Sequence, residues 1–82
     1  MQILNIAAYK FVPLGELPAL QASLAQALAM RGIKGTVLLA EEGINLFLAA
    51  GSAAIHDFLA WLRRDVRFQD LDTKKSWSLA TR

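Results

Sequence analysis

The chain has 82 residues, of which 55% are hydrophobic and 20% are charged, and its formal net charge is +2. This length and composition predict one small globular domain over residues 1–82 and exclude a disordered chain. The absence of cysteine excludes a disulfide framework, a thiolate zinc site and a cysteine nucleophile, and it is typical of a reducing compartment. Neither a membrane span nor a secretory signal is evident, so we expect a cytoplasmic protein with no membrane partner.

The first elements are read from apolar periodicity. Ile3–Val12 has strand composition and stops at Pro13, which cannot donate to a strand ladder. Leucines then recur at three- and four-residue spacing in residues 16–31, and this spacing predicts an amphipathic helix. Arg31 suits the negative end of that helix, and Gly32 can take the left-handed conformation that ends it.

The second half of the chain repeats this order after a strand pair. We predict strands at Lys34–Ala40 and Ile44–Ala49, followed by a helix that Ser52 caps through its hydroxyl. The segment Arg67–Trp77 is predicted as an edge strand. The apolar stripe of the second helix consists of Ile55, Phe58, Leu59 and Leu62.

The resulting order is β-α-β-β-α-β, which is the ferredoxin-like (acylphosphatase-like) arrangement of the α+β class. In this arrangement an antiparallel sheet carries both helices on one face, and its first and third strands are central. The alternation assigns a buried face to both central strands. The residues predicted to pack under the helices are Leu4, Ile6, Ala8, Ile44, Leu46 and Leu48.

The acidic pair Glu41-Glu42 precedes Gly43 between the two middle strands, where a hairpin tip is expected. Carboxylates that act as acid and base must flank a reacting bond in different environments, and neighbours on an exposed turn do not. A metal site needs further ligands, whereas the only histidine, His56, has no histidine four residues later. The sequence therefore predicts a turn with positive φ at Gly43, and it indicates no catalytic residue, metal or cofactor.

The face of the sheet opposite the helices is predicted to interleave amides with aromatic rings. It carries Asn5, Ala7, Tyr9, Phe11, Asn45 and Phe47. Such a surface is typical of sheets on which RNA bases stack. It is also typical of a face covered by another domain or by a dimer partner. The sequence leaves both interpretations open.

The basic residues gather toward the C-terminus. Six basic and three acidic residues follow Leu62 and give +3, whereas three basic and four acidic residues up to Leu62 give −1. Either a solvated basic tail or a phosphate-binding patch fits this distribution. The candidate RNA or interdomain contacts are Tyr9, Lys10, Lys34, Asn45, Phe47, Arg63, Arg64, Arg67, Lys74 and Lys75.

Three segments carry a resemblance to a known family: "AAYKFVPL", "IKGTVLLAEEGIN" and "FLAWLRRDVRFQDLDTKKSW". Together they resemble the N-terminal domain of the rhodanese-like tRNA uridine hydroxylases, also called rhodanese-related sulfurtransferases. The most specific part is Lys34-Gly35 followed by the hairpin residues Glu41, Glu42, Gly43, Ile44 and Asn45. Here Leu46-Phe47 replaces the Gly-Thr that often continues this motif in the family.

The resemblance implies an acylphosphatase-like domain that is followed, in the full-length protein, by a rhodanese domain absent from this chain. It also implies that the full-length enzyme hydroxylates the wobble uridine of tRNA with oxygen, through a cysteine of the rhodanese domain. The loop "KFVPLGELP" has one glycine and no arginine, so it lacks the phosphate cradle of acylphosphatases. We therefore expect no enzyme activity from this chain alone.

Three hypotheses follow. The first is an accessory domain that engages tRNA or positions the rhodanese domain of the same protein. The second is a purely structural interdomain or dimerisation module. The third, an autonomous small enzyme, would depend on Glu41, Glu42 and His56 alone.

Overall fold

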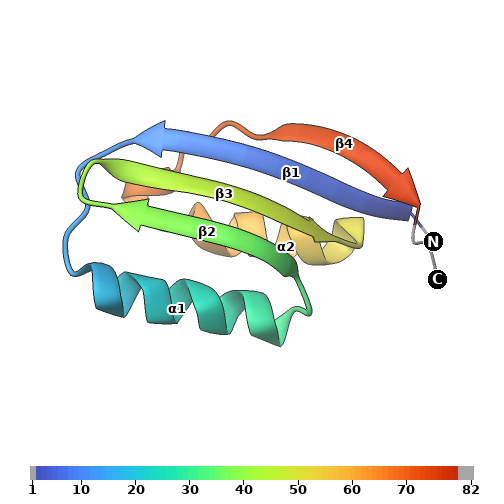
Figure 1. The fold of residues 1–82 in the computed structure, drawn as a ribbon, viewed down its shortest axis with the longest axis horizontal. Helices are drawn as coiled ribbons and strands as arrows, with labels where there is room; N and C mark the ends of the chain where they lie inside the picture. The colour runs from blue at the N-terminus through green and yellow to red at the C-terminus, as the bar shows by residue number, and fades with distance from the viewer. Residues whose placement is uncertain (1, 80–82) are drawn as a thin grey trace.

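The computed structural model describes residues 2–79, which form two layers (Figure 1). One layer is an antiparallel sheet with the strand order β2-β3-β1-β4, and the other consists of two helices on one face of that sheet. This arrangement confirms the predicted ferredoxin-like fold, with the first and third strands in the centre. The elements are β1 (Gln2–Phe11), α1 (Leu17–Met30), β2 (Lys34–Ala40), β3 (Gly43–Ala50), α2 (Ser52–Leu62), the 3₁₀ helix η1 (Val66–Phe68) and β4 (Lys74–Leu79).

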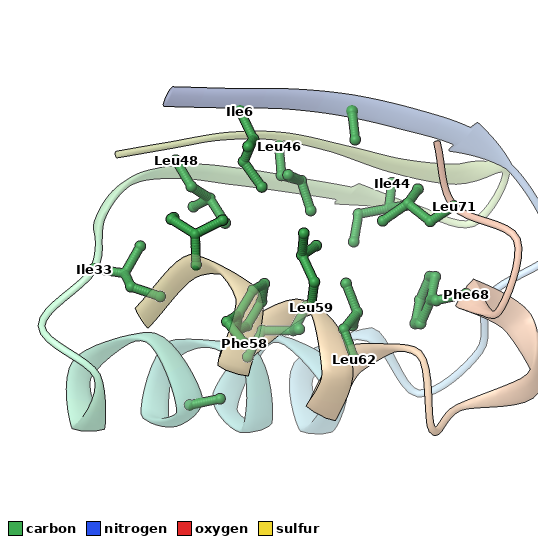
Figure 2. Packing of buried hydrophobic residues seen from close by; sticks show 14 of the residues in the cluster. Ile6, Ile33, Ile44, Leu46, Leu48, Phe58, Leu59, Leu62, Phe68 and Leu71 are labelled. Atoms are coloured by element: carbon green, nitrogen blue, oxygen red, sulfur yellow. The ribbon is translucent and has the colours of Figure 1, made fainter. Parts of the chain in front are cut away.

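The hydrophobic core lies between the sheet and the helices (Figure 2). The predicted buried face is confirmed, because alternate residues of β1 and β3 are all buried there. Figure 2 shows Leu46 and Leu48 pointing from the sheet toward the helix layer, from which Phe58 points back. Burial of apolar surface stabilises the fold by roughly 25 cal/mol per Å², so this shared core holds both helices against one face of the sheet. The other face of the sheet is left uncovered by helices.

The ends of the two helices differ. Gly32 ends the α1 segment with a φ of 65°, as predicted, and the Arg31 guanidinium donates to the Ala27 carbonyl oxygen at 2.9 Å. The prediction that Ser52 caps α2 is wrong, because Gly51 is the N-cap residue and Ser52 already belongs to the helix. An N-cap side chain must precede the helix to accept a hydrogen bond from a backbone N–H of its first turn, and Ser52 lies inside that turn. Neither helix of residues 2–79 is long and apolar enough to cross a membrane.

The predicted edge strand at Arg67–Trp77 is wrong in its first half, where the chain forms η1. The Asp65 carboxylate caps η1 by accepting a hydrogen bond from the Arg67 backbone N–H at 3.0 Å. Phe68 and Leu71 are buried in the core, so this segment packs against the hydrophobic core and does not pair with the sheet. The strand begins only at Lys74. Arg82, which belongs to the basic C-terminal segment, lies outside the described residues.

The predicted positive φ at Gly43 is also wrong. Positive φ occurs in residues 2–79 at Gly32, at Gly35 and at the non-glycine residue Glu16. Gly43 is instead the first residue of β3, where it pairs with Phe11 of β1. The turn itself is confirmed, but its backbone reversal does not use the conformational freedom of that glycine.

Candidate functional site

The sheet face away from the helices is called the open face here (Figure 1). Paired residues of neighbouring strands project to the same side, so the strand register arranges the open face in rows that cross the sheet. The first row is Lys34, Ala49, Asn5 and Ser76; the second is Thr36, Phe47, Ala7 and Lys74; the third is Leu38, Asn45 and Tyr9. The register thus brings five predicted contact residues together on this face: Tyr9, Lys34, Asn45, Phe47 and Lys74.

The first two rows enclose a basic hollow, defined by Lys34, Asn5, Phe47, Ala7 and Lys74. It has a volume of about 500 Å³. Lys34 lies on one edge strand of the sheet and Lys74 on the other. Alanines form much of the floor, and the Phe47 side chain is 52% exposed. Among residues 2–79 no carboxylate lines this hollow, so the side-chain charge that these residues bring to it is positive.

The other end of the open face is the apolar end, defined by Tyr9, Phe11 and Leu38. Their side chains are 65%, 80% and 57% exposed, respectively. The rings of Tyr9 and Phe11 meet edge to face with centroids 5.8 Å apart. Two carboxylates border this end, because Glu42 and Asp72 line the hollows beside it. The open face therefore changes from basic to apolar and partly acidic along its strands.

Several of the other predicted contact residues hold the fold together. Lys10 lies on the helix-covered side, where its Nζ donates to the Arg67 carbonyl oxygen at 2.8 Å and to the Asp70 carboxylate. Arg63 donates through Nη2 to the Leu71 carbonyl oxygen at 2.7 Å. These contacts fasten the segment between α2 and β4 to the body of the domain.

Lys75 lines the edge of the basic hollow beside Lys74, whereas Arg64 lies on a different surface. Lys75 is paired with Ile6, a core residue, so it projects from β4 to the side opposite Lys74. Arg64 is exposed just beyond the end of α2. The structure therefore distributes the predicted basic residues over several surfaces and leaves Lys34 and Lys74 on the open face.

Two ion pairs stabilise charged side chains near η1. Side-chain hydrogen bonds from Arg67 lower the pKa of the Asp65 carboxyl, and the same bonds raise the pKa of the Arg67 guanidinium. The hydrogen bond from Lys10 lowers the pKa of the Asp70 carboxyl. All three shifts favour the ionised forms, as expected for ion pairs that brace a loop.

The Glu41–Asn45 hairpin contacts the connection between β1 and α1 through its backbone. The Glu41 carbonyl oxygen accepts from the Leu14 N–H at 2.9 Å, and the Glu42 carbonyl oxygen accepts from the Val12 N–H at 3.0 Å. Both glutamates are exposed, and within residues 2–79 no three histidine, cysteine, aspartate or glutamate side chains gather as metal ligands. The hairpin thus positions the start of the first crossover.

The two glycines of the Lys34–Asn45 motif are required by close backbone contacts. A Cβ on Gly43 would lie 2.2 Å from the Lys10 carbonyl oxygen, and a Cβ on Gly35 would lie 1.9 Å from the Phe47 carbonyl oxygen. Gly35 also has a φ of 143°, which side chains rarely adopt. Glycine therefore lets β2 and β3 approach their neighbours closely under the open face.

A sequence model described as the UPF0176 acylphosphatase like domain matches residues 3–82 of the chain. The chain belongs to this family. The match confirms the family resemblance predicted from three segments of the sequence, of which the Lys34–Asn45 motif is the most specific. The name describes a likeness of fold, which agrees with the β-α-β-β-α-β order of this acylphosphatase-like domain.

Curated relatives of this acylphosphatase-like domain are much longer proteins. One from Variovorax paradoxus, named tRNA uridine(34) hydroxylase, is 56% identical over 79 residues, which are 96% of this chain and 30% of the relative. Another of that name, from Bordetella petrii, is 61% identical over 77 residues, which are 93% of this chain and 30% of the relative. The chain therefore spans about three tenths of the length of these relatives.

A solved structure described as "BlsA photo-activated state" has the same fold as this acylphosphatase-like domain. Its TM-score is 0.67 at 16% sequence identity, and the match covers 100% of this chain and 61% of that chain. At this identity the similarity concerns the fold alone.

Sequence reasoning missed several exposed apolar residues of the acylphosphatase-like domain, among them Leu38, Trp77 and Leu79 of the sheet. Alternation starting at Lys34 would have placed Leu38 on the open face, but the apolar centre of that strand obscured the pattern. Trp77 and Leu79 lie in β4, whose start the sequence did not reveal. They project to the side of the sheet that faces the helices.

Proposed function

We propose that this chain is a non-catalytic accessory domain of a tRNA-modifying enzyme and that it engages tRNA through the open face. The relatives named tRNA uridine(34) hydroxylase support the enzyme class, and the chain's share of their length supports an accessory role. Oxygen-dependent hydroxylation of the uridine then belongs to the full-length protein. A C-terminal rhodanese domain and tRNA are the proposed partners, and the cytoplasm is the proposed location.

The observation that carries this proposal is the placement of Lys34 and Lys74 on opposite edges of one open face, with Phe47 between them. Phosphates dominate nucleic-acid affinity, and exposed rings add stacking with unpaired bases. Within residues 2–79 no carboxylate lines the basic hollow, which favours the approach of a polyanion.

Adjacent lysines offer a matched test. Lys74 projects onto the open face and Lys75 projects to the other side, although both carry the same charge on the same strand. We expect Lys74→Ala to weaken tRNA binding and to make the slope of log affinity against log salt shallower by about 0.7 to 0.9. Lys75→Ala should change both quantities less, because the Lys75 side chain projects away from the open face although the residue borders the basic hollow. Fluorescence anisotropy with labelled tRNA over a salt series measures both; equal effects of the two variants would contradict binding through the open face.

The apolar end supports a second candidate function, a contact with another domain or a second copy of the chain. Tyr9, Phe11 and Leu38 form a contiguous exposed apolar surface, which is typical of protein contacts. In this case Tyr9→Ala should weaken association with a separately supplied rhodanese domain, or self-association measured by sedimentation. If tRNA affinity also stays unchanged in Lys74→Ala, the structural role replaces the tRNA-binding role.

A further inference from the structure

The basic hollow differs from a general basic patch because it combines charge, a ring and a small-residue floor. Neighbouring strands lie about 4.8 Å apart, so Lys34 and Lys74 flank a width of about 14 Å across β3 and β1. Between them, Ala7 and Ala49 leave space above the sheet, and the half-exposed ring of Phe47 stands beside that space. Its volume of about 500 Å³ falls within the roughly 300–1,000 Å³ range of small-ligand sites.

The hollow also offers hydrogen-bonding groups at its β4 side. The Asn5 Nδ2 donates to the Ser78 hydroxyl at 3.0 Å, which fixes the amide on the sheet. No hydrogen bond within residues 2–79 uses the Asn5 Oδ1, so this oxygen can accept a hydrogen bond from a ligand. The exposed Ser76 hydroxyl lies in the same row. An orienting acceptor beside a ring is what the edge of a nucleobase requires.

From this arrangement we propose that the basic hollow binds an unpaired RNA nucleotide, with its base stacked on Phe47 and the adjoining phosphates at Lys34 and Lys74. The inference rests on the proposed function and makes it more specific, because it assigns single-stranded RNA as the ligand. The strand of RNA crosses the sheet from β2 to β4, along the rows of the open face. Duplex RNA does not fit this site, since its bases are stacked within the helix and cannot reach the ring.

Charge distribution restricts the site to this end of the open face. Glu42 lines a hollow at the apolar end, and Asp72 lines a neighbouring hollow that reaches from Phe11 to Phe47 and Lys74. Among residues 2–79 no carboxylate lines the basic hollow itself, so phosphates meet the least repulsion there. Phe47 lines the basic hollow and is the ring assigned to the RNA base, whereas Phe11 does not line it. The two phenylalanines differ in position but not in chemistry, so they form a matched pair.

The test compares Phe47→Leu with Phe11→Leu in the binding of a short single-stranded oligouridylate and of a blunt RNA duplex of comparable length. We expect the wild type to prefer the single strand. Loss of stacking in Phe47→Leu should weaken that binding about 5- to 150-fold, without a change in salt slope. Phe11→Leu should bind as the wild type does, and Phe47→Tyr should retain most of the affinity because it keeps a ring. Lys34→Ala should make the salt slope shallower by about 0.7.

The outcomes separate this inference from the proposed function. If the wild type binds the duplex as tightly as the single strand, or if both leucine variants bind alike, the nucleotide site is wrong. The proposed function then still stands if Lys74→Ala weakens tRNA binding more than Lys75→Ala does. If the wild type binds no RNA of any kind, both proposals fail. If Phe47→Leu alters self-association in sedimentation but not RNA affinity, the hollow is a protein contact. Thermal unfolding of each variant checks that the fold persists.

Discussion

Gly43 and Lys10 lie so close together that a Cβ on Gly43 would be 2.2 Å from the Lys10 carbonyl oxygen. The contact joins the start of β3 to the end of β1, where Gly43 pairs with Phe11. Glycine is therefore needed here because a neighbouring strand occupies the space of a side chain. The turn just before Gly43 carries the carbonyl groups of Glu41 and Glu42, which hold the start of the connection between β1 and α1.

Gly43→Ala should lower the free energy of unfolding by about 1–3 kcal/mol, because the added methyl group must displace the backbone of β1. Gly43→Val should cost at least as much. Urea titration followed by circular dichroism measures the change. Gly15→Ala is the matched control, since nothing lies within 4 Å of a Cβ at that position. Equal stability of Gly43→Ala and the wild type would contradict the close contact.

Gly35→Ala should destabilise the domain more than Gly43→Ala does. A Cβ at position 35 would lie 1.9 Å from the Phe47 carbonyl oxygen. The φ of 143° would add backbone strain of about 1–3 kcal/mol for alanine. Gly32→Ala separates the two causes, because Gly32 has a positive φ of 65° but open space around its Cβ. The expected order of loss in urea titrations is Gly35, then Gly32 and Gly43, then Gly15. A smaller loss at Gly35 than at Gly32 would refute the steric argument.

Two phenylalanines test the separation of core and open face. Phe58 is 0% exposed in the core, whereas Phe11 is 80% exposed at the apolar end. Phe58→Ala should cost about 3–5 kcal/mol, which approaches the whole stability expected of a domain of this size. Phe11→Ala should stay within about 0.5 kcal/mol of the wild type. Chemical unfolding of both variants measures this difference in stability. Similar losses of stability would show that the Phe11 side chain is buried in solution.

Acid stability should depend on Asp65. Hydrogen bonds from Arg67 lower the pKa of this carboxyl in the folded state, so its contribution is present above the ordinary value of 3.8 and is lost as pH falls through the folded-state value. Asp65→Asn keeps a side-chain oxygen for the N-cap but removes the charge. We expect the variant to be less stable at neutral pH by less than about 1 kcal/mol, because the pair is about one-third exposed.

The difference between wild type and Asp65→Asn should shrink as the pH falls below about 4, since the wild-type carboxyl then becomes protonated. Urea midpoints at several pH values measure this dependence. Arg67→Gln removes the same interaction and should give a parallel profile. A difference that persists undiminished at low pH would show that the charge of Asp65 does not stabilise the fold.

The fold was predictable because periodicity and alternation determine which faces are buried. Buried apolar residues recur at every second position from Leu4 in β1 and around Leu46 in β3. The central strands and their core face could therefore be assigned from the sequence. The 3₁₀ helix could not, because Asp65 and Arg67 form a local cap that no apolar pattern reports. Gly43 shows the same limit, since its requirement arises from contact with Lys10, which is distant in sequence.

The candidate site was only partly predictable, for a related reason. Alternation placed Tyr9 and Phe47 on one face, but the position of a lysine on that face depends on strand start and register. Lys74 and Lys75 are neighbours in sequence and project to opposite sides. Lys10 looked equally available, yet its ammonium group is used in the fold. Charge composition alone therefore cannot identify a binding surface.

The isolated chain should show no hydroxylase, sulfurtransferase or acylphosphatase activity. It has no cysteine for sulfur or oxygen chemistry, and its first crossover loop has one glycine and no arginine to bind a phosphoryl group. Its adjacent carboxylates, Glu41 and Glu42, are exposed on a turn whose carbonyl groups hold Leu14 and Val12. Tests with tRNA and oxygen, with a sulfur donor and with an acyl phosphate should all give background rates.

A matched pair of variants, Glu41→Gln and Glu42→Gln, tests the autonomous-enzyme hypothesis against the predicted lack of activity. If Glu41 were a general acid or base, Glu41→Gln would abolish turnover, and turnover retained in Glu42→Gln would assign that role to Glu41 alone. Turnover that follows this pattern would contradict the accessory role. We expect both variants and the wild type to be equally inactive and equally stable, because the hydrogen bonds of the hairpin come from backbone groups that neither substitution removes.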